Sequence, residues 1–284
     1  MRTIGLSRRN SWQRFMGHGG GKRAAPVLKA GLPPLLLRCV EMLRESTSGT
    51  SASRLHSSRY AALASRLPAK RLVFAGVLMF VLYICMDVIA SLAYDDYSYR
   101  DQTISELSAI GAPTRTFWVV TGLVRQVLSF AFAFGVLGLA GDRREVRIVG
   151  WLLVVFAVSD LLWWFAPMHQ REVLAADGGT WQDTLHLVLG GISSLLFFAM
   201  IGVGAFAFGR HFRWYSFATL GLMVAFGALM GAETSDVSDN APTPWLGIWE
   251  RIAIEGAMLW EAIFAIVLLW FARGPRTTGE RTRA

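Results

Sequence analysis

The chain has 284 residues, of which 54% are hydrophobic and 17% are charged. A soluble domain carries about 25% charged residues, so this composition excludes an ordinary water-soluble fold. The net charge of +8 does not indicate a nucleic-acid partner. Residues 1–71 hold 14 Lys/Arg and 2 Asp/Glu, whereas residues 72–284 hold 14 Lys/Arg and 18 Asp/Glu and have no basic stripe of their own.

Residues 1–71 predict a basic, disordered arm on the cytoplasmic side of a membrane. Their only apolar stretch, residues 32–40, is too short to span and contains Pro33 and Pro34. We favour a tail that lies against anionic lipid headgroups. The same composition is also typical of an organellar transit peptide, or of a start codon assigned too far upstream. Cys39 and Cys85 are too few for a disulfide framework and are interpreted as free thiols.

Six apolar runs follow the arm, each close to the ~20 residues that cross the hydrocarbon of a bilayer. They lie at residues 72–94, 116–140, 146–165, 183–208, 214–231 and 249–272. The sequence therefore predicts an all-α fold, a polytopic transmembrane helix bundle of six spans. Residues 273–284 are predicted to form a basic cytoplasmic tail.

The charges of the loops predict the orientation. Arginines follow the second, fourth and sixth runs, whereas acidic residues occupy the three alternate loops. Because basic loops stay in the cytoplasm, we expect a multi-pass protein of the cell (plasma or inner) membrane with both termini cytoplasmic. The three long loops then face outward.

Five ionisable residues lie at membrane depth in the predicted spans, away from the span ends: Asp87, Arg125, Asp160, Glu255 and Glu261. An ionisable group at membrane depth is costly unless it is paired or hydrated, so each one is a candidate functional residue. At ~1.5 Å of helical rise per residue, Asp87, Asp160 and Glu255 share a depth in the outer half of the membrane. Arg125 and Glu261 lie nearer the midplane. The structural alternative is a buried pair between Arg125 and one acid that only fixes the bundle.

The first outer loop contains Thr103-Ile104-Ser105-Glu106-Leu107. Thr103 and Glu106 have the spacing of a capping box, which predicts the start of a short interfacial helix. A catalytic role for Ser105 or Glu106 is the alternative interpretation.

The second outer loop offers candidate metal ligands. Thr180 and Asp183 again have capping-box spacing, and Asp183 and His186 would then share one helix face. The two side chains could form an acid/base pair, or they could bind a divalent metal such as zinc in a site completed by His169 or by a buried acid such as Asp87. The alternative is a hydrogen-bonded structural histidine at the membrane interface.

The sixth run begins with Trp249-Glu250-Arg251, and Arg251 and Glu255 lie one helical turn apart on a common face. With the cation before the acid, this is the weaker helical orientation, so a lipid headgroup or a loop carboxylate is a better expected partner for Arg251. Alternatively, Trp249 and Arg251 form an interfacial anchor.

Three of these stretches carry a family resemblance: Thr103-Ile104-Ser105-Glu106-Leu107, Asp183-Thr184-Leu185-His186 and Trp249-Glu250-Arg251. Over residues 72–272 the chain resembles a prokaryotic membrane family catalogued as domain of unknown function nine-nine-eight. The resemblance implies a six-helix bundle and carries no established activity. Residues 1–71 look foreign to that family.

Three functions remain open, in descending order of preference. The first is a non-enzymatic protein whose outward-facing polar pocket binds a lipid headgroup or small molecule, with these ligand-binding candidates: Asp87, Arg125, Asp160, His186, Arg251 and Glu255. The second is a metal-dependent, membrane-embedded lipid hydrolase in which His169, Asp183 and His186 hold the metal, with these catalytic candidates: Asp87, Ser105 and Asp160. The third is a proton-coupled transporter, because acids outnumber bases at membrane depth.

The expected partners are membrane lipids, and a homo-oligomer is a further possibility. Gly227 and Gly231 have GxxxG spacing, and Gly190 and Ser194 form a similar pair of small residues. Such pairs allow close contact between membrane helices.

Overall fold

The computed structural model describes residues 50–272, with side chains from residue 68 onward. Six helices in this range are long and apolar enough to span a membrane. They are α2 (Thr50–Ala93), α3 (Arg115–Ala140), α4 (Arg144–Asp160), α6 (Trp181–Gly204), α7 (Arg210–Ala232) and α9 (Leu246–Phe271), and the 3-10 helix η2 (Leu161–Phe165) continues α4. The predicted polytopic six-span bundle is confirmed.

The first helix begins earlier than predicted. Residues 50–71 form the first part of α2 instead of disordered chain, and the apolar segment of α2 begins at Pro68. This stretch is rich in Ala, Leu and Arg, which are strong helix formers. The remainder of the predicted arm, residues 1–49, and the predicted tail, residues 273–284, lie outside the described residues.

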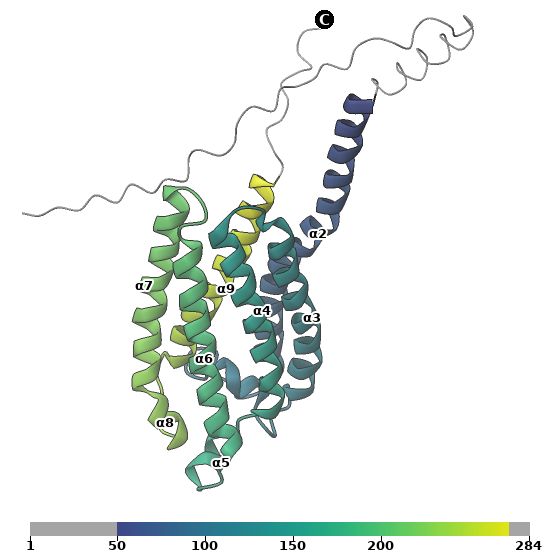
Figure 1. Cartoon of the computed structure of the whole chain (residues 1–284). Coiled ribbons are helices and arrows are strands. Elements are labelled where there is room, and N and C mark those ends of the chain that lie inside the picture. Colours follow the sequence, from purple (N-terminus) through teal and green to yellow (C-terminus); the bar gives the residue numbers. More distant parts are fainter. Residues whose placement is uncertain (1–49, 273–284) are drawn as a thin grey trace, which may run out of the picture. The chain divides into compact units, whose positions relative to one another are not determined.

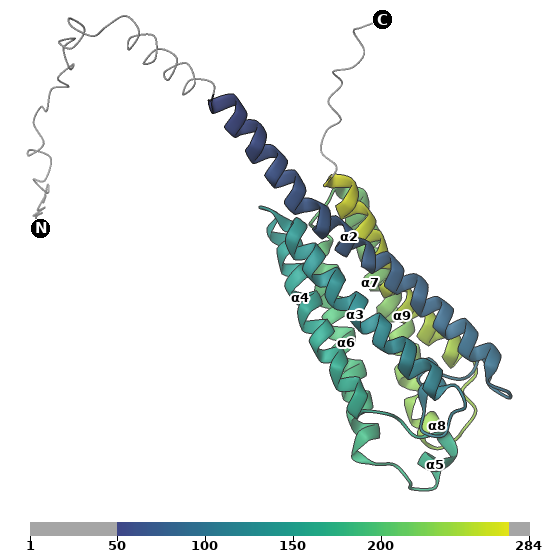
Figure 2. The same ribbon diagram turned by 90° about the vertical axis from the view of Figure 1, so that its right-hand side faces the viewer.

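The spanning helices run alternately up and down (Figures 1 and 2). In space α3 lies against α4, α4 against α6, α6 against α7, and α7 against α9. Helix α2 packs closely on α3, because a Cβ added at Gly135 would lie 2.5 Å from the backbone nitrogen of Val73. The fold therefore brings the first and last spans into one bundle with the four spans between them.

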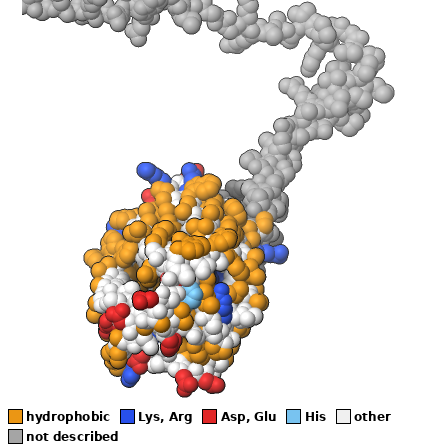
Figure 3. All heavy atoms as spheres, turned by 90° about the horizontal axis from the view of Figure 1, so that it is seen from below, with side chains coloured by type: hydrophobic (Ala, Val, Ile, Leu, Met, Phe, Trp, Pro, Cys, Tyr) orange, Lys and Arg blue, Asp and Glu red, His pale blue; other side chains and the backbone are white. Residues whose placement is uncertain are grey.

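Three long loops lie at one end of the bundle, hereafter the loop end: residues 94–114, 166–180 and 233–245 (Figure 1). They contain the 3-10 helix η1 (Ile104–Ser108) and the short helices α5 (Arg171–Ala175) and α8 (Thr234–Ser238). Figure 3 looks at this end and shows acidic side chains and a histidine among uncharged ones, with hydrophobic side chains around them.

Local signals fix the helix ends. The capping boxes predicted at Thr103 and Glu106, and at Thr180 and Asp183, are both present, and they start η1 and α6. Between α3 and α4 the chain turns at Gly141, whose φ of 53° favours glycine.

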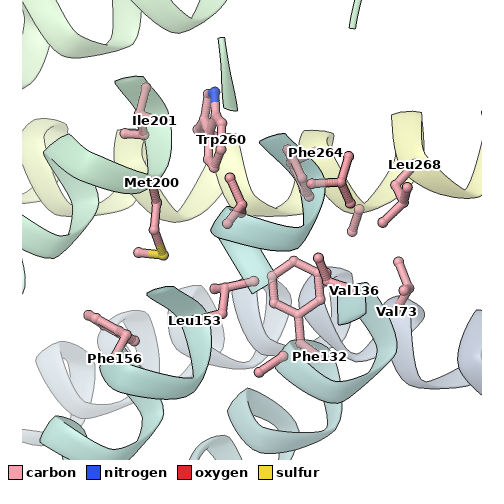
Figure 4. Packing of buried hydrophobic residues seen from close by; sticks show 14 of the residues in the cluster. Val73, Phe132, Val136, Leu153, Phe156, Met200, Ile201, Trp260, Phe264 and Leu268 are labelled. Carbon is pink, nitrogen blue, oxygen red and sulfur yellow. The ribbon is translucent and has the colours of Figure 1, made fainter. Parts of the chain in front are cut away.

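The core lies between the helices, and large apolar side chains also cover the outer faces. Figure 4 shows buried residues from five spans in contact, among them Val73, Phe132, Leu153, Met200 and Phe264. Outward-facing side chains such as those of Leu92 and Leu195 are instead 83% and 69% exposed. Exposed apolar side chains over all six spans are expected of helices that face lipid.

Candidate functional site

A cavity of about 680 Å³ lies between the spanning helices and reaches the loop end. Most of its wall is apolar and includes Met79, Trp118, Phe156, Phe197 and Met223. Its polar lining includes Thr103, Ser105, Ser108, Arg115, Arg125, Gln126, Asp160, Asp183, His186, Glu250 and Glu261. Ligand pockets in proteins have volumes of roughly 300–1,000 Å³, so this cavity has the size of a ligand site.

Glycines contribute to the open space. Gly122, Gly190 and Gly227 line the cavity, and a Cβ added at any of them would meet no other atom within 4 Å. The small-residue pairs predicted for helix contacts therefore do not hold two described helices together: Gly231 is equally open, and the Ser194 hydroxyl donates to the Gly190 carbonyl within α6. A homo-oligomer through them stays a prediction.

Ser105 and His186 meet at the loop end of the cavity. The Ser105 Oγ lies 2.9 Å from His186 Nε2, and His186 Nδ1 lies 2.8 Å from the Ala166 carbonyl oxygen. The carbonyl can only accept, so Nδ1 carries the proton and Nε2 accepts the hydrogen bond from the serine hydroxyl. Trp163 packs against the imidazole edge-to-face with ring centroids 4.7 Å apart and holds the ring in this orientation.

Charge-assisted bonds hold η1, which carries Ser105. The Glu106 carboxylate accepts from the backbone N–H of Thr103 at 2.7 Å and from two nitrogens of Arg171, Nε at 2.6 Å and Nη2 at 2.9 Å. The Ile104 N–H donates to the Glu250 carboxylate of α9. Paired donors on a carboxylate fix geometry as well as charge, so the position of Ser105 does not depend on His186.

The same network joins all three long loops. Arg171 Nη1 also donates to Thr243 Oγ1 at 2.8 Å, and the Thr243 hydroxyl donates to the Asp101 carbonyl at 2.8 Å. The Asp101 carboxylate in turn accepts from Arg100 and from the Trp245 N–H. The hydrogen bond from Arg100 is the main cause that lowers the pKa of Asp101 below its usual value.

The three predicted metal ligands have separate partners. Asp183 accepts from the His169 N–H at 2.7 Å, and its Oδ2 lies 2.9 Å from His169 Nδ1. His186 instead bonds Ser105 and Ala166, although it lies on the same helix as Asp183. Among the residues that the structure describes, no three His, Cys, Asp or Glu side chains lie close enough together to hold a metal ion. The predicted site therefore divides into a His–Asp pair and a His–Ser pair.

Deeper in the cavity, Arg125 pairs with Asp160 across α3 and α4. This confirms the structural pairing that the sequence left as an alternative. Glu261 is 1% exposed, and neither of its carboxylate oxygens has a hydrogen-bond partner among the described residues. A buried polar group without a partner is rare in native proteins.

Arg251 and Asp87 form a second buried pair, between α9 and α2. Arg251 Nε and Nη2 donate to the two Asp87 oxygens at 2.8 and 2.9 Å, and Nη1 donates to the Tyr99 carbonyl at 2.9 Å. The expectation of a headgroup or loop carboxylate for Arg251 is therefore wrong. The two residues are 164 positions apart, so no local spacing indicated the contact.

The predicted ligand-binding residues divide between two places. Arg125, Asp160 and His186 line the large cavity, whereas Arg251 and Glu255 line a separate pocket of about 370 Å³ beside Tyr99. Asp87 lines neither cavity and is 0% exposed. The catalytic candidate Asp87 is thus paired with Arg251, and it does not line the cavity that Ser105 and Asp160 line.

Three residues of the site were missed by reasoning from sequence. Arg115 lines the cavity at the start of α3 and donates to the Ser108 carbonyl at 2.6 Å, with no carboxylate within 4.0 Å in the described part of the chain. Arg171 and Glu250 hold η1. Glu250 could have been found from sequence, because it belongs to the Trp249-Glu250-Arg251 stretch that carries the family resemblance. Arg115 and Arg171 resemble ordinary charged residues of loops.

The fold and the polar cavity together define the class of this protein as a polytopic helical membrane protein with a cavity among its six spans. The chain belongs to the family described as protein of unknown function (DUF998), whose model matches residues 74–267. The family resemblance is thereby confirmed. No curated protein and no solved structure matches the chain.

Proposed function

We propose that this protein binds one amphipathic molecule with an anionic headgroup, a membrane lipid, in the cavity between its spans. The observation that carries the proposal is the cavity itself, with about 680 Å³ of space, a mostly apolar wall and hydrogen-bonding groups at its loop end. An acyl chain suits the wall at Phe156, Phe197 and Met223, and a headgroup suits Thr103, Ser108 and Arg115.

Arg115 determines the sign of the headgroup. The other arginine on the cavity wall, Arg125, is already paired with Asp160. Among the described residues Arg115 donates only to a backbone carbonyl, so its positive charge is available to a phosphate or carboxylate. Asp183 is engaged by His169 and Thr180, which limits repulsion of an anion at this end.

We place the protein in the plasma or inner membrane of the cell. In the proposed orientation its loop end faces outward and both termini lie in the cytoplasm. Arginines at the opposite end, such as Arg143, Arg144 and Arg147, support it through the positive-inside rule. The headgroup site then lies on the outer side of the membrane.

The test measures which lipid the protein retains. Protein purified in detergent is exchanged against equal amounts of phosphatidylglycerol and phosphatidylcholine, and the bound lipid is counted by native mass spectrometry. We expect wild type to retain one molecule, with phosphatidylglycerol preferred, and Arg115→Gln to lower that preference by about tenfold, because one charge-assisted hydrogen bond is lost.

Arg100→Gln is the matched control, because Arg100 also lies at the loop end but is exposed and does not line the cavity. It should keep the preference of the wild type. Retention of neither lipid by wild type, or an unchanged preference in Arg115→Gln, would contradict the proposal.

A further inference from the structure

Ser105 and His186 have the geometry of a nucleophile and its base. The hydroxyl donates to the unprotonated Nε2 at 2.9 Å, and the Ala166 carbonyl fixes the tautomer by accepting from Nδ1 at 2.8 Å. Serine is a weak nucleophile until a neighbouring base removes its proton, and that base must be oriented by a third group. Here a backbone carbonyl provides the orientation that a carboxylate often supplies.

A purely architectural role does not account for this hydrogen bond. Residues of η1 are already anchored by Arg171 through Glu106 and by Glu250 through the Ile104 N–H. The Ser105 hydroxyl has no other partner than His186 among the described residues. The pair thus adds little to the anchoring of the turn and leaves a hydroxyl poised on the cavity.

The pair lies where the proposed lipid would place its ester. Both Ser105 and His186 line the large cavity, at the end where the apolar wall gives way to polar groups. In a glycerolipid the ester bonds lie between the acyl chain and the headgroup, so they would lie at this boundary. Arg115 reaches the same turn through the Ser108 carbonyl, at 2.6 Å, and brings a positive charge near the reacting group.

We propose that Ser105 and His186 cleave an acyl ester of an amphipathic lipid bound in the cavity; this inference rests on the proposed lipid-binding function. Ser105 Oγ attacks the ester carbonyl carbon while His186 Nε2 takes the hydroxyl proton. The ester C–O bond breaks, and the departing alcohol takes that proton from Nε2. Water then attacks the acyl-serine carbonyl with His186 again as base, and releases the fatty acid and the free Ser105 hydroxyl.

The experiment uses dodecyl fluorophosphonate, which forms a P–O bond with an activated serine and loses fluoride. Full-length protein is treated in detergent, the intact mass is measured, and the modified residue is found by peptide mass spectrometry. We expect one phosphonyl adduct on Ser105 of wild type. Ser105→Ala should gain none, and His186→Gln should react at least about 100-fold more slowly, because the general base is lost.

Ser194→Ala is the control, since Ser194 also lines the cavity but its hydroxyl donates to the Gly190 carbonyl within α6. It should be labelled as fast as wild type. No adduct on wild type, or an adduct on any residue other than Ser105, overturns the inference. Peptide mapping of wild type gives this answer even if Ser105→Ala does not fold.

Lipid retention by the same preparations separates the two proposals, where retained lipid is counted as intact phosphatidylglycerol or as the lysolipid that cleavage would leave. A wild type that retains phosphatidylglycerol but gains no adduct overturns the esterase inference and leaves lipid binding in place. A wild type that retains no lipid and gains no adduct contradicts both the lipid-binding proposal and the esterase inference. Labelling of Ser105 without retained lipid supports the nucleophile and contradicts the proposed preference for an anionic headgroup.

Discussion

The Arg171 side chain contacts all three long loops. It pairs with Glu106 of the first loop, lies in the second, and donates to Thr243 of the third. Both members of the pair are buried, with side chains 9% and 5% exposed. Its contribution is therefore chiefly to fix η1 and, with it, the position of Ser105.

Replacing Arg171 alone should destabilise the protein more than replacing Arg171 and Glu106 together. Arg171→Met leaves the Glu106 carboxylate buried without its cation, which costs about 3–5 kcal/mol in the free energy of unfolding. The double variant Arg171→Met/Glu106→Gln should recover a large part of that loss. Chemical denaturation in detergent measures both, and equal losses in the single and double variants would contradict this account of the pair.

Some residue roles followed from local spacing and others could not. The capping boxes at Thr103 and Thr180 were predicted because a cap and its partner lie three residues apart. Ser105 and His186 are 81 residues apart, and Glu106 and Arg171 are 65 apart. A single sequence holds no signal for which distant polar residues meet, so these pairs required the structure.

At the scale of helices, close approach between α2 and α3 depends on glycine. A Cβ added at Gly135 would lie 2.5 Å from Val73 N and 2.7 Å from the Leu72 carbonyl carbon, both backbone atoms that cannot move aside alone. Membrane helices have little hydrophobic drive to associate, so backbone contact of this kind matters for their packing.

Gly135→Val should therefore push α2 and α3 apart and lower the free energy of unfolding by about 1–3 kcal/mol. Gly202→Val in α6 is the control, because a Cβ there meets nothing within 4 Å. Thermal unfolding in detergent compares the two variants. A Gly135→Val midpoint no lower than that of the control would show that this contact does not hold the helices.

Helix positions were largely predictable, because ~20-residue apolar runs have few other interpretations. All six runs became spans. The main difference is the start of α2 at Thr50, where composition suggested disorder and the local sequence favours helix. No single apolar run indicates which spans lie side by side. The contact of α2 with α9 through Asp87 and Arg251 is an example.

In the whole molecule, some polar groups inside the bundle pair with one another and others line the large cavity. Two arginines within the spanning helices, Arg125 and Arg251, are paired with Asp160 and Asp87, so much of the charge inside the bundle is structural. The large cavity also carries polar groups outside these two ion pairs, among them Arg115, the hydrogen-bonded Ser105–His186 pair and Glu261. We therefore expect this cavity to hold a lipid.

A side chain that fills the cavity should displace this lipid. Gly227 and Gly221 are both on α7, a Cβ at either meets nothing within 4 Å, and only Gly227 lines the cavity. We predict that Gly227→Leu lowers phosphatidylglycerol retention in native mass spectrometry by at least about tenfold, a loss of about 1.4 kcal/mol in binding, whereas Gly221→Leu retains it as wild type does. Equal retention by Gly227→Leu and Gly221→Leu would contradict a lipid site between these helices.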